Sequence, residues 1–358
     1  MEIYPRKKTR ALKLGSLTIG GAAPIVIQSM NNTKTQDAAS SLAQLQELYQ
    51  AGCQVGRLAV PDMEAAEALA EIVKDSPMPL VADIHFDYRL ALAAVRAGIA
   101  GLRINPGNIG GAERVRQVAL AAGAAGIPIR IGVNGGSLDK RLLSKYGGIT
   151  AEALCESALE QAEQLESCGF HDIKISLKCT ELPVMLAAYR RMSQLTDYPL
   201  HIGVTEAGTL RRGSLKNAIG IGTLLSEGIG DTLRVSLTAD PVEEVRVARE
   251  ILQMLGLEQG GWQFVSCPTC GRTCIDLIGL AQRVEQELSS IVPKRRRKIA
   301  VMGCAVNGPG EASDADLGLA GGANGGLIFR YGEKLGFFSE AELLPEFLRL
   351  ARALAEED

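Results

Sequence analysis

The stretch PIVIQSMNNTKTQDAASSLAQLQELYQAGCQVGRLAV (24–60) contains the repeating unit that decides the fold. It begins and ends with short runs rich in β-branched residues, and an alanine-rich segment with helical spacing lies between them. Nearly continuous apolar strands that alternate with helices are typical of a parallel sheet covered on both faces. The stretch therefore predicts a strand, a helix and a second strand parallel to the first.

The same unit recurs through the first two-thirds of the chain. Eight strand-like runs occur, each with a polar or charged residue near its end: PIVIQSM (24–30), QVGRLAV (54–60), PLVADIH (79–85), GLRINP (101–106), PIRIGVN (128–134), DIKISLK (172–178), LHIGVTE (200–206) and TLRVSLT (232–238). Eight units in about 250 residues predict an α/β fold of the closed (β/α)8 TIM-barrel type. The structural alternative is an open doubly wound sheet, but Gly220-Ile221-Gly222 lacks the third glycine of a dinucleotide-binding fingerprint.

The two ends of the chain predict further features. RALKLGSLTIGG (10–21) is typical of a hairpin that turns at Gly15-Ser16, and we expect it to plug the N-terminal end of the barrel. After Gly256 the repeat stops, and the remaining residues predict a smaller α+β domain. We therefore expect a barrel over residues 1–256 and a second domain over 257–358.

Composition limits the class of protein. Apolar residues make up 46% of the chain, which is enough for well-buried cores. A net charge of −3 and an aromatic content of 4% argue against nucleic acid as the main partner. The N-terminus lacks the apolar segment of a signal peptide, and no apolar run approaches the about 18 residues of a membrane span. We expect a cytoplasmic protein whose eight cysteines are reduced thiols or metal ligands.

Polar side chains gather at the predicted strand ends, which meet at one mouth in a barrel. They are Arg57, Asp83, His85, Arg103, Asn105, Arg130, Asn134, Lys174, Lys178, His201, Glu206, Arg234 and Ser236. Cations directed at one mouth repel each other unless an anion lies between them, and guanidinium groups match phosphate oxygens. The sequence thus predicts a pocket for a phosphate or diphosphate, with Glu206 as the candidate acid–base residue.

Simpler explanations remain open for single residues. An arginine at a strand end often pairs with a local carboxylate, and His85 and His201 are equally explained as hydrogen-bonded residues of the barrel wall. The basic run KRRRK (294–298) is interpreted as a solvent-exposed face. Four cysteines lack ligand spacing and are expected to pack as small hydrophobic residues: Cys53, Cys155, Cys168 and Cys179.

Three other cysteines have the spacing of a metal or iron–sulfur site. Cys267 and Cys270 form a C-x-x-C pair, and Cys304 follows in the glycine- and proline-rich segment GCAVNGPGE (303–311). The spacing leaves the fourth ligand open between Glu311 and Cys274. A cysteine one turn into a helix, as Cys274 is expected to be, is equally able to pack away from the site.

Six motifs together closely resemble the 4-hydroxy-3-methylbut-2-en-1-yl diphosphate synthase family, the iron–sulfur reductases of the methylerythritol phosphate route to isoprenoids. They are IQSMNNT (27–33), VADIHFDYRLA (81–91), LRINPGNIG (102–110), HIGVTEAG (201–208), SCPTCGRT (266–273) and GCAVNGPGE (303–311). The resemblance implies a two-domain enzyme that carries a [4Fe–4S] cluster on Cys267, Cys270, Cys304 and Glu311. It also implies flavodoxin or ferredoxin as electron donor, and a head-to-tail homodimer with shared active sites.

The substrate implied by the resemblance is 2-C-methyl-D-erythritol 2,4-cyclodiphosphate, which is opened and dehydroxylated to 4-hydroxy-3-methylbut-2-enyl diphosphate. Glu206 is the implied acid–base residue, and Asn307 lies on the cluster side of the site. The predicted substrate-binding residues are Arg57, Asp83, Arg103, Asn105, Arg130, Asn134, Lys178, His201, Arg234 and Ser236.

Two other functions stay possible on the sequence. One is a barrel hydrolase or aldolase for a phosphorylated sugar, with the cysteines holding zinc. The other is a non-catalytic redox or pterin-binding module, which would not open a cyclodiphosphate. Metal content distinguishes the zinc enzyme from an iron–sulfur reductase. Turnover of the cyclodiphosphate distinguishes the non-catalytic module from that reductase.

Overall fold

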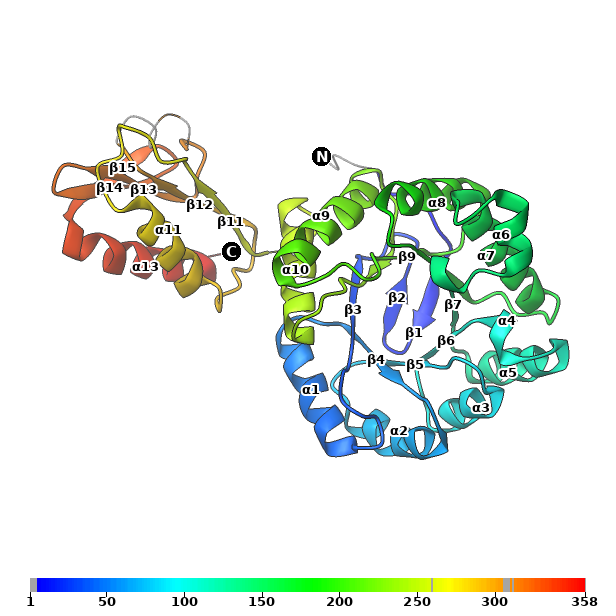
Figure 1. Ribbon diagram of the computed structural model, residues 1–358. Coiled ribbons are helices and arrows are strands. Elements are labelled where there is room, and N and C mark those ends of the chain that lie inside the picture. Colours follow the sequence, from blue (N-terminus) through cyan, green and yellow to red (C-terminus); the bar gives the residue numbers. More distant parts are fainter. Residues whose placement is uncertain (1–4, 259, 305–309, 311, 358) are drawn as a thin grey trace. The chain divides into compact units, whose positions relative to one another are not determined.

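The computed structural model describes residues 5–258, 260–304, 310 and 312–357 (Figure 1). The chain divides into two compact units, residues 1–251 and 252–358, each of which has its own sheet. This division lies a few residues before the domain boundary expected at about residue 256. Residues Asn307 and Glu311, both expected near the cluster, lie outside the described residues.

The first unit is a barrel of eight parallel strands inside a ring of helices (Figure 1). The strand order is β8-β7-β6-β5-β4-β3-β10-β9, and the bridge between Ile175 and Leu200 brings the two ends of the sheet together. The strands are β3 (Val26–Met30), β4 (Val55–Ala59), β5 (Leu80–Asp83), β6 (Gly101–Ile104), β7 (Ile129–Asn134), β8 (Ile173–Lys178), β9 (His201–Ile202) and β10 (Thr232–Leu233). The predicted TIM-type barrel is confirmed, and each strand lies within its predicted run.

Helices follow the strands and cover the outside of the barrel. Several begin at a residue that favours helix starts: the side chains of Asp37, Asp62 and Asp87 each accept a backbone N–H of the first turn. The helices are α1 (Ala38–Gln50), α2 (Met63–Asp75), α3 (Tyr88–Arg96), α5 (Ala112–Ala125), α7 (Ala151–Glu166), α8 (Leu182–Leu195), α9 (Leu210–Ser226) and α10 (Pro241–Met254), with the shorter α4 (Pro106–Ile109), η1 (Gly135–Ser137) and α6 (Lys140–Tyr146) in loops.

The N-terminal hairpin plugs one end of the barrel, as predicted. Strands β1 (Leu12–Leu14) and β2 (Leu17–Ile19) pair antiparallel, and Gly15 in the turn has φ +58°. Side chains from the hairpin form one buried cluster with the first residues of neighbouring barrel strands: Leu12, Leu14, Ile19, Val26, Val55 and Val81. Because side chains alternate along a strand, the next inward positions lie toward the open end. There the interior changes from apolar to polar, with Arg57 and Asp83 two residues beyond Val55 and Val81.

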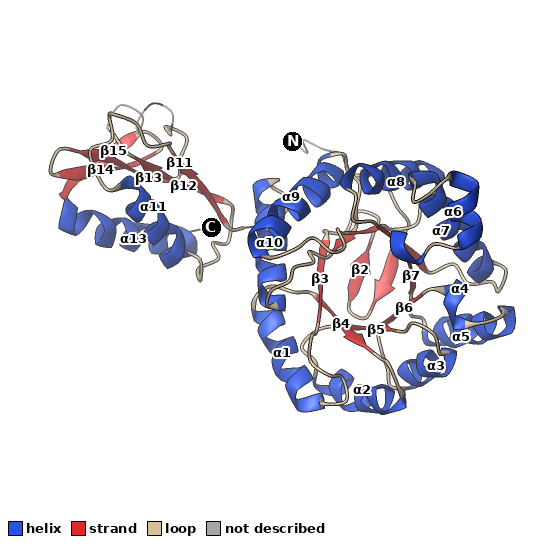
Figure 2. Cartoon of the chain, in the orientation of Figure 1, coloured by secondary structure: helices blue, strands red, loops and turns tan. Residues whose placement is uncertain are grey.

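The second unit is a five-stranded mixed sheet with helices on one face (Figure 2). Its strands are β11 (Trp262–Ser266), β12 (Arg297–Met302), β13 (Leu317–Gly322), β14 (Gly325–Arg330) and β15 (Glu333–Ser339), in that order. The first three are parallel and the last two are antiparallel additions. Helices α11 (Leu277–Leu288) and α13 (Glu340–Glu356) bury Val284, Leu288 and Phe347 against the sheet.

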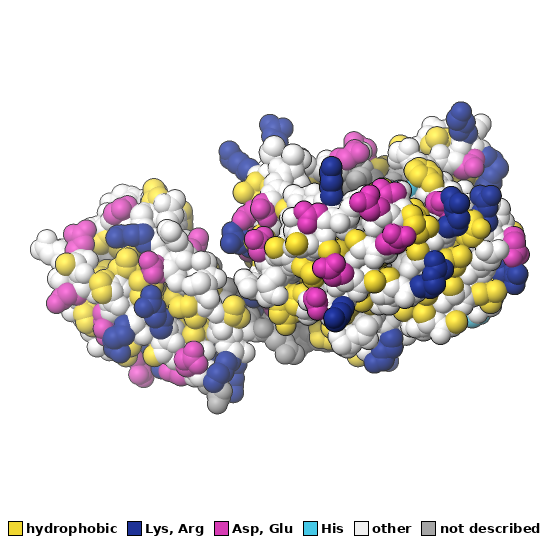
Figure 3. All heavy atoms as spheres, turned by 90° about the horizontal axis from the view of Figure 1, so that it is seen from below, with side chains coloured by type: hydrophobic (Ala, Val, Ile, Leu, Met, Phe, Trp, Pro, Cys, Tyr) yellow, Lys and Arg dark blue, Asp and Glu magenta, His cyan; other side chains and the backbone are white. Residues whose placement is uncertain are grey.

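The face seen in Figure 3 mixes charges of both signs with scattered apolar side chains. The basic run 294–298 was expected to be a solvent-exposed face, and this is wrong for Arg297. That side chain is buried at the start of β12, where it pairs with Asp316 at 3.4 Å. None of the helices in the described ranges combines the length and the hydropathy of a membrane-spanning segment.

Candidate active site

A cavity of about 230 Å³ lies where the carboxyl ends of the barrel strands meet. It is lined by Arg57, Asp83, His85, Arg103, Arg130, Gly132, Asn134, Ser176, Lys178, Thr205, Arg234 and Ser236. Nine of these residues were predicted at strand ends, and the closed barrel brings them together from six strands around the ring. Five lining side chains are cationic and only one is a carboxylate.

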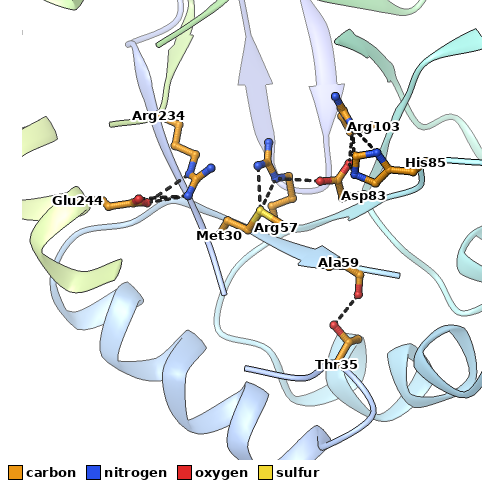
Figure 4. A network of polar contacts seen from close by, with 9 residues as sticks. All are labelled: Met30, Thr35, Arg57, Ala59, Asp83, His85, Arg103, Arg234 and Glu244. Carbon is orange, nitrogen blue, oxygen red and sulfur yellow. Dashed lines mark hydrogen bonds and ion pairs between the residues drawn. The ribbon is translucent and has the colours of Figure 1, made fainter. Parts of the chain in front are cut away.

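Asp83 is the carboxylate on the cavity wall. Its Oδ1 accepts a hydrogen bond from Arg103 Nη1 at 3.0 Å, and its Oδ2 lies 3.6 Å from Arg57 Nε (Figure 4). His85 Nε2 is 3.7 Å from the same carboxylate. Burial disfavours the charged carboxylate, but the hydrogen bond with His85 and the charges of Arg57 and Arg103 outweigh it. They hold the pKa of Asp83 well below its ordinary value.

Arg57 is fixed on both sides. Its Nη2 donates to the sulfur of Met30 at 2.8 Å, and its Nε faces Asp83 (Figure 4). Burial, partly offset by Asp83, lowers the pKa of Arg57 to about 10, so the side chain stays charged at neutral pH. The backbone and both neighbours therefore hold this guanidinium in one place.

Arg130 and Lys178 are the two cavity-lining cations that have no carboxylate partner among the described residues. Only 3% of Arg130 and 7% of Lys178 is exposed, and the Nε and Nη2 atoms of Arg130 are buried without a hydrogen bond. Burial and the neighbouring cations lower the pKa of both groups well below their ordinary values. Unpaired buried cations are costly, so this side of the cavity favours an anionic ligand.

Arg234 faces a carboxylate that was not expected from the sequence. Glu244, in the first turn of α10, accepts from Nε at 3.2 Å and from Nη2 at 3.1 Å (Figure 4). Ser176, Thr205 and Gly132 also line the cavity without having been predicted. Ser176 was recognisable as an inward position, because it lies two residues before Lys178 on the same strand. No comparable sequence pattern pointed to the contact between Glu244 and Arg234.

Within the described part of the chain, three predicted substrate-binding or catalytic residues do not line the cavity. Asn105 caps α4, where its Oδ1 accepts the N–H of Gly107 at 3.0 Å. His201 is fully buried inside the barrel, with Nδ1 2.8 Å from Thr232 Oγ1, and burial lowers its pKa well below the ordinary value. Glu206 is exposed directly after the lining residue Thr205, in a left-handed conformation with φ 51°.

In the second unit, adjacent parallel strands place the cysteines near one another. Ser266 pairs with Val301, so Cys267 follows β11 at the level where β12 leads to Cys304. The N–H of Gly303 donates to Cys267 Sγ at 3.2 Å, and the N–H of Cys274 donates to the carbonyl of Gly303 at 3.1 Å. The loop that carries the C-x-x-C pair is thus attached to the strand end that precedes Cys304.

This donor set suits an iron–sulfur group. Thiolates from two neighbouring strand ends are the ligands that such groups take, and a backbone N–H directed at a cysteine sulfur is the contact that stabilises them. Within the described ranges, no three His, Cys, Asp or Glu side chains are already arranged around one point. Cys274 is exposed, and its Sγ donates to the carbonyl of Arg272 at 3.2 Å.

The remaining cysteines are structural. Cys53, Cys155 and Cys179 are buried as expected, and burial raises the pKa of the Cys53 and Cys155 thiols to about 11. Cys168 departs from the expectation, because it is only half-buried and donates to the carbonyl of Gln164. The eight cysteines all lie among the described residues, and none forms a disulfide.

Comparison with known proteins gives matches over both units. Residues 9–249 match the family model described as the GcpE TIM-barrel domain, and residues 263–353 match the GcpE protein C-terminal domain. Among solved structures, a dihydropteroate synthase of Yersinia pestis covers 69% of this chain and 97% of its own, with a TM-score of 0.51 and 11% identity. At that identity the likeness concerns the barrel fold alone.

Curated relatives match over nearly the full length. The chain is 56% identical to a protein of Clostridium perfringens, over 98% of this chain and 99% of the relative, and 58% identical to one of Maridesulfovibrio salexigens, over 96% of each. A protein of Geobacter sulfurreducens is 54% identical, over 98% of this chain and 99% of its own. With both domains matched and relatives aligned from end to end, the chain belongs to the GcpE family, whose members named here are each called 4-hydroxy-3-methylbut-2-en-1-yl diphosphate synthase (flavodoxin).

Proposed function

We propose that this chain reduces 2-C-methyl-D-erythritol 2,4-cyclodiphosphate to 4-hydroxy-3-methylbut-2-enyl diphosphate, with flavodoxin as the electron donor. The observation that carries the proposal is the cavity at the barrel mouth, where five cations face one carboxylate. Family membership and the names of the relatives point to the same reaction. The zinc-dependent hydrolase or aldolase and the pterin-binding module have no comparable support.

The cavity binds and orients the diphosphate. Arg130 and Lys178 supply the charge that no carboxylate of the described chain neutralises, and Arg57 is held in place by Asp83 and Met30. A group fixed before the substrate arrives loses little entropy on binding, so the ring is held in one orientation for reaction. The reaction takes up two electrons and protons, breaks the ring C–O bond and releases the C3 hydroxyl as water.

We propose that Cys267, Cys270 and Cys304 hold a [4Fe–4S] cluster, with Glu311 as the fourth ligand. The hydrogen bond from Gly303 to Cys267 and the neighbouring strand ends support the three thiolates. Glu311 lies outside the described residues, and the exposed Cys274 is the alternative. When bound, such a cluster supplies electrons one at a time.

Glu206 is our candidate proton donor. It stands next to the lining residue Thr205, and no hydrogen bond or ion pair engages its side chain within the described part of the chain. A non-glycine residue with positive φ costs about 1 kcal/mol, and such strain is often found at functional sites. Asn307 is proposed to lie on the cluster side of the site.

We also propose a head-to-tail homodimer in which each cluster domain serves the partner's barrel. Helix α10 runs away from the mouth for 14 residues, about 21 Å. The connection after it is held at both ends, by Leu257 N–H to the Leu252 carbonyl at 2.8 Å and by Gly261 N–H to the Pro293 carbonyl at 3.3 Å. Residues 257–261 can span at most about 18 Å at full extension, and this short reach supports the proposal.

Mixing variants tests the dimer. Glu206→Gln removes the barrel's proton donor, and Cys270→Ser removes a cluster ligand. Combined after subunit exchange, they should regain up to one working site of two. A fully active monomer in solution, or no recovery after proven exchange, contradicts the dimer.

Anaerobic turnover tests the reaction itself. Cluster-loaded protein with reduced flavodoxin should convert the cyclodiphosphate to 4-hydroxy-3-methylbut-2-enyl diphosphate, identified by mass spectrometry. No product from protein with full iron content would refute the proposed function.

A further inference from the structure

We propose that Glu244 is a positioning residue for the cavity: it holds Arg234 in the orientation that the substrate needs and fixes the turn that carries Ser236. The inference rests on the proposed function for the identity of the ligand. Glu244 lies outside the lining of the cavity, so it acts through other residues rather than on the substrate.

The carboxylate of Glu244 is shared between three parts of the barrel. Its two oxygens accept from Nε and Nη2 of Arg234 at 3.1–3.2 Å. Oε1 also accepts the backbone N–H of Leu237 at 3.0 Å, and Oε2 accepts the hydroxyl of Ser29 on β3 at 3.2 Å. Only 4% of Glu244 is exposed. A buried carboxylate with this many donors has one favoured position.

The pair leaves one end of the Arg234 guanidinium open. Nε and Nη2 are taken by Glu244, whereas Nη1 has no hydrogen bond to any described residue. Arg234 lines the cavity, so this free N–H group is available to an anion. The fork geometry therefore determines where Arg234 presents its charge.

The same carboxylate stabilises the turn after β10. Leu237 follows Ser236, whose carbonyl accepts from Asn217 Nδ2 at 3.2 Å, and the N–H of Thr238 donates to the carbonyl of Gly208 at 2.9 Å. The turn that holds Ser236 is thus attached to α10 on one side and to the loop after Glu206 on the other. Loss of the Glu244 contact releases one of these attachments.

Glu244 and Asp83 divide the cations between them. In Figure 4 the Arg234–Glu244 pair lies on the opposite side of Arg57 from Asp83. Each carboxylate anchors cations of its own wall, and Arg130 and Lys178 remain unpaired. Glu244 therefore orients Arg234 and leaves the charges of Arg130 and Lys178 available to an anionic ligand.

The variant Glu244→Gln keeps the size of the side chain and replaces one oxygen with an N–H donor. Both oxygens of Glu244 accept hydrogen bonds from Arg234. The amide NH2 of Gln would therefore face an N–H group of Arg234 on one side, where no hydrogen bond can form. We expect kcat to fall by about tenfold or more because the guanidinium loses its orientation. The dissociation constant of the cyclodiphosphate should stay within about threefold, because removal of the carboxylate's negative charge offsets the lost order. Glu243→Gln, in the same turn of α10 but paired with Arg246 at the surface, is the matched control.

A double-mutant cycle separates positioning from a general structural role. If Glu244 acts through Arg234, Glu244→Gln should change kcat by less than about twofold in an Arg234→Met background. The inference is overturned by near wild-type kcat in the single variant, or by an equal loss in both backgrounds. Should Glu244→Gln not fold, Glu244→Asp replaces it in the same cycle. An inactive wild-type protein with full iron content would instead contradict the proposed function.

Discussion

The barrel mouth and the cysteine loop both lie at the carboxyl ends of parallel strands, yet they are built differently. In the barrel, functional side chains stand on the strands themselves, and Arg57, Asp83 and Arg103 are buried and paired. In the second unit, Cys267 and Cys270 lie in a loop after β11, and Cys270 is exposed. The barrel site is therefore arranged before its ligand binds, whereas we expect the cysteines to be drawn together by the proposed cluster.

The largest effect should come from a cysteine ligand. Cys304→Ser removes a buried thiolate, so the purified protein should lose essentially all of the about four irons per chain expected for this cluster. The matched variant Cys274→Ser should keep its iron, because the proposed fourth ligand is Glu311 and the Cys274 thiol donates to the carbonyl of Arg272. Iron analysis after anaerobic purification measures both. Iron loss in Cys274→Ser, together with an intact cluster in Glu311→Ala, would reverse the choice of the fourth ligand.

The next largest effect should come from the unpaired cations. Arg130→Met or Lys178→Met removes a desolvated charge that faces the anion, so binding of the cyclodiphosphate should weaken by about 2–4 kcal/mol. Titration calorimetry measures the loss, and iron content should not change. Arg190→Met, which removes a surface arginine paired with Glu227, serves as the control. Unchanged affinity in the cavity variants would place the anion elsewhere.

Asp83→Asn should affect stability as well as binding. It leaves Arg57 and Arg103 buried without their countercharge, which should lower the free energy of unfolding by about 2–3 kcal/mol at neutral pH. The pKa of Asp83 is depressed in the folded state, so its contribution is complete above the unfolded value of about 3.9 and is lost as pH falls below it. Denaturant unfolding should therefore show that the difference in free energy of unfolding between wild type and Asp83→Asn becomes smaller between about pH 5 and pH 3. A difference that stays constant over this pH range contradicts the role of Asp83 as the ionised partner of Arg57 and Arg103.

The smallest effect should come from the closed end of the barrel. Gly15 has φ +58°, and an added Cβ would lie 2.9 Å from Pro79 Cγ, so Gly15→Ala should cost about 1–2 kcal/mol of stability. Turnover by the folded protein should be unchanged because the hairpin lies away from the mouth. A large loss of kcat at full stability would mean that the plug takes part in the reaction.

The barrel could be predicted because each strand run is apolar, short and followed by a helix pattern. The cavity residues followed from the same alternation, since Arg130, Asn134 and Lys178 sit at inward positions, the last two at the final residues of β7 and β8. Glu244 could not be predicted, because its contact with Arg234 depends on how α10 packs against β3 and β10. Asn105 is a strand-end residue in sequence, yet it serves as a helix cap. Sequence periodicity places a side chain on a face, but only packing determines its partner.

The central claim is that the barrel alone binds the anion, separately from the cysteine site. Its most direct test is calorimetric titration of the cyclodiphosphate into iron-free Cys304→Ser protein. If the barrel alone carries the anion site, the dissociation constant should lie within about threefold of that of the iron-loaded protein. Absence of measurable binding to the folded, iron-free variant would show that the barrel mouth is not a complete site before the metal group binds.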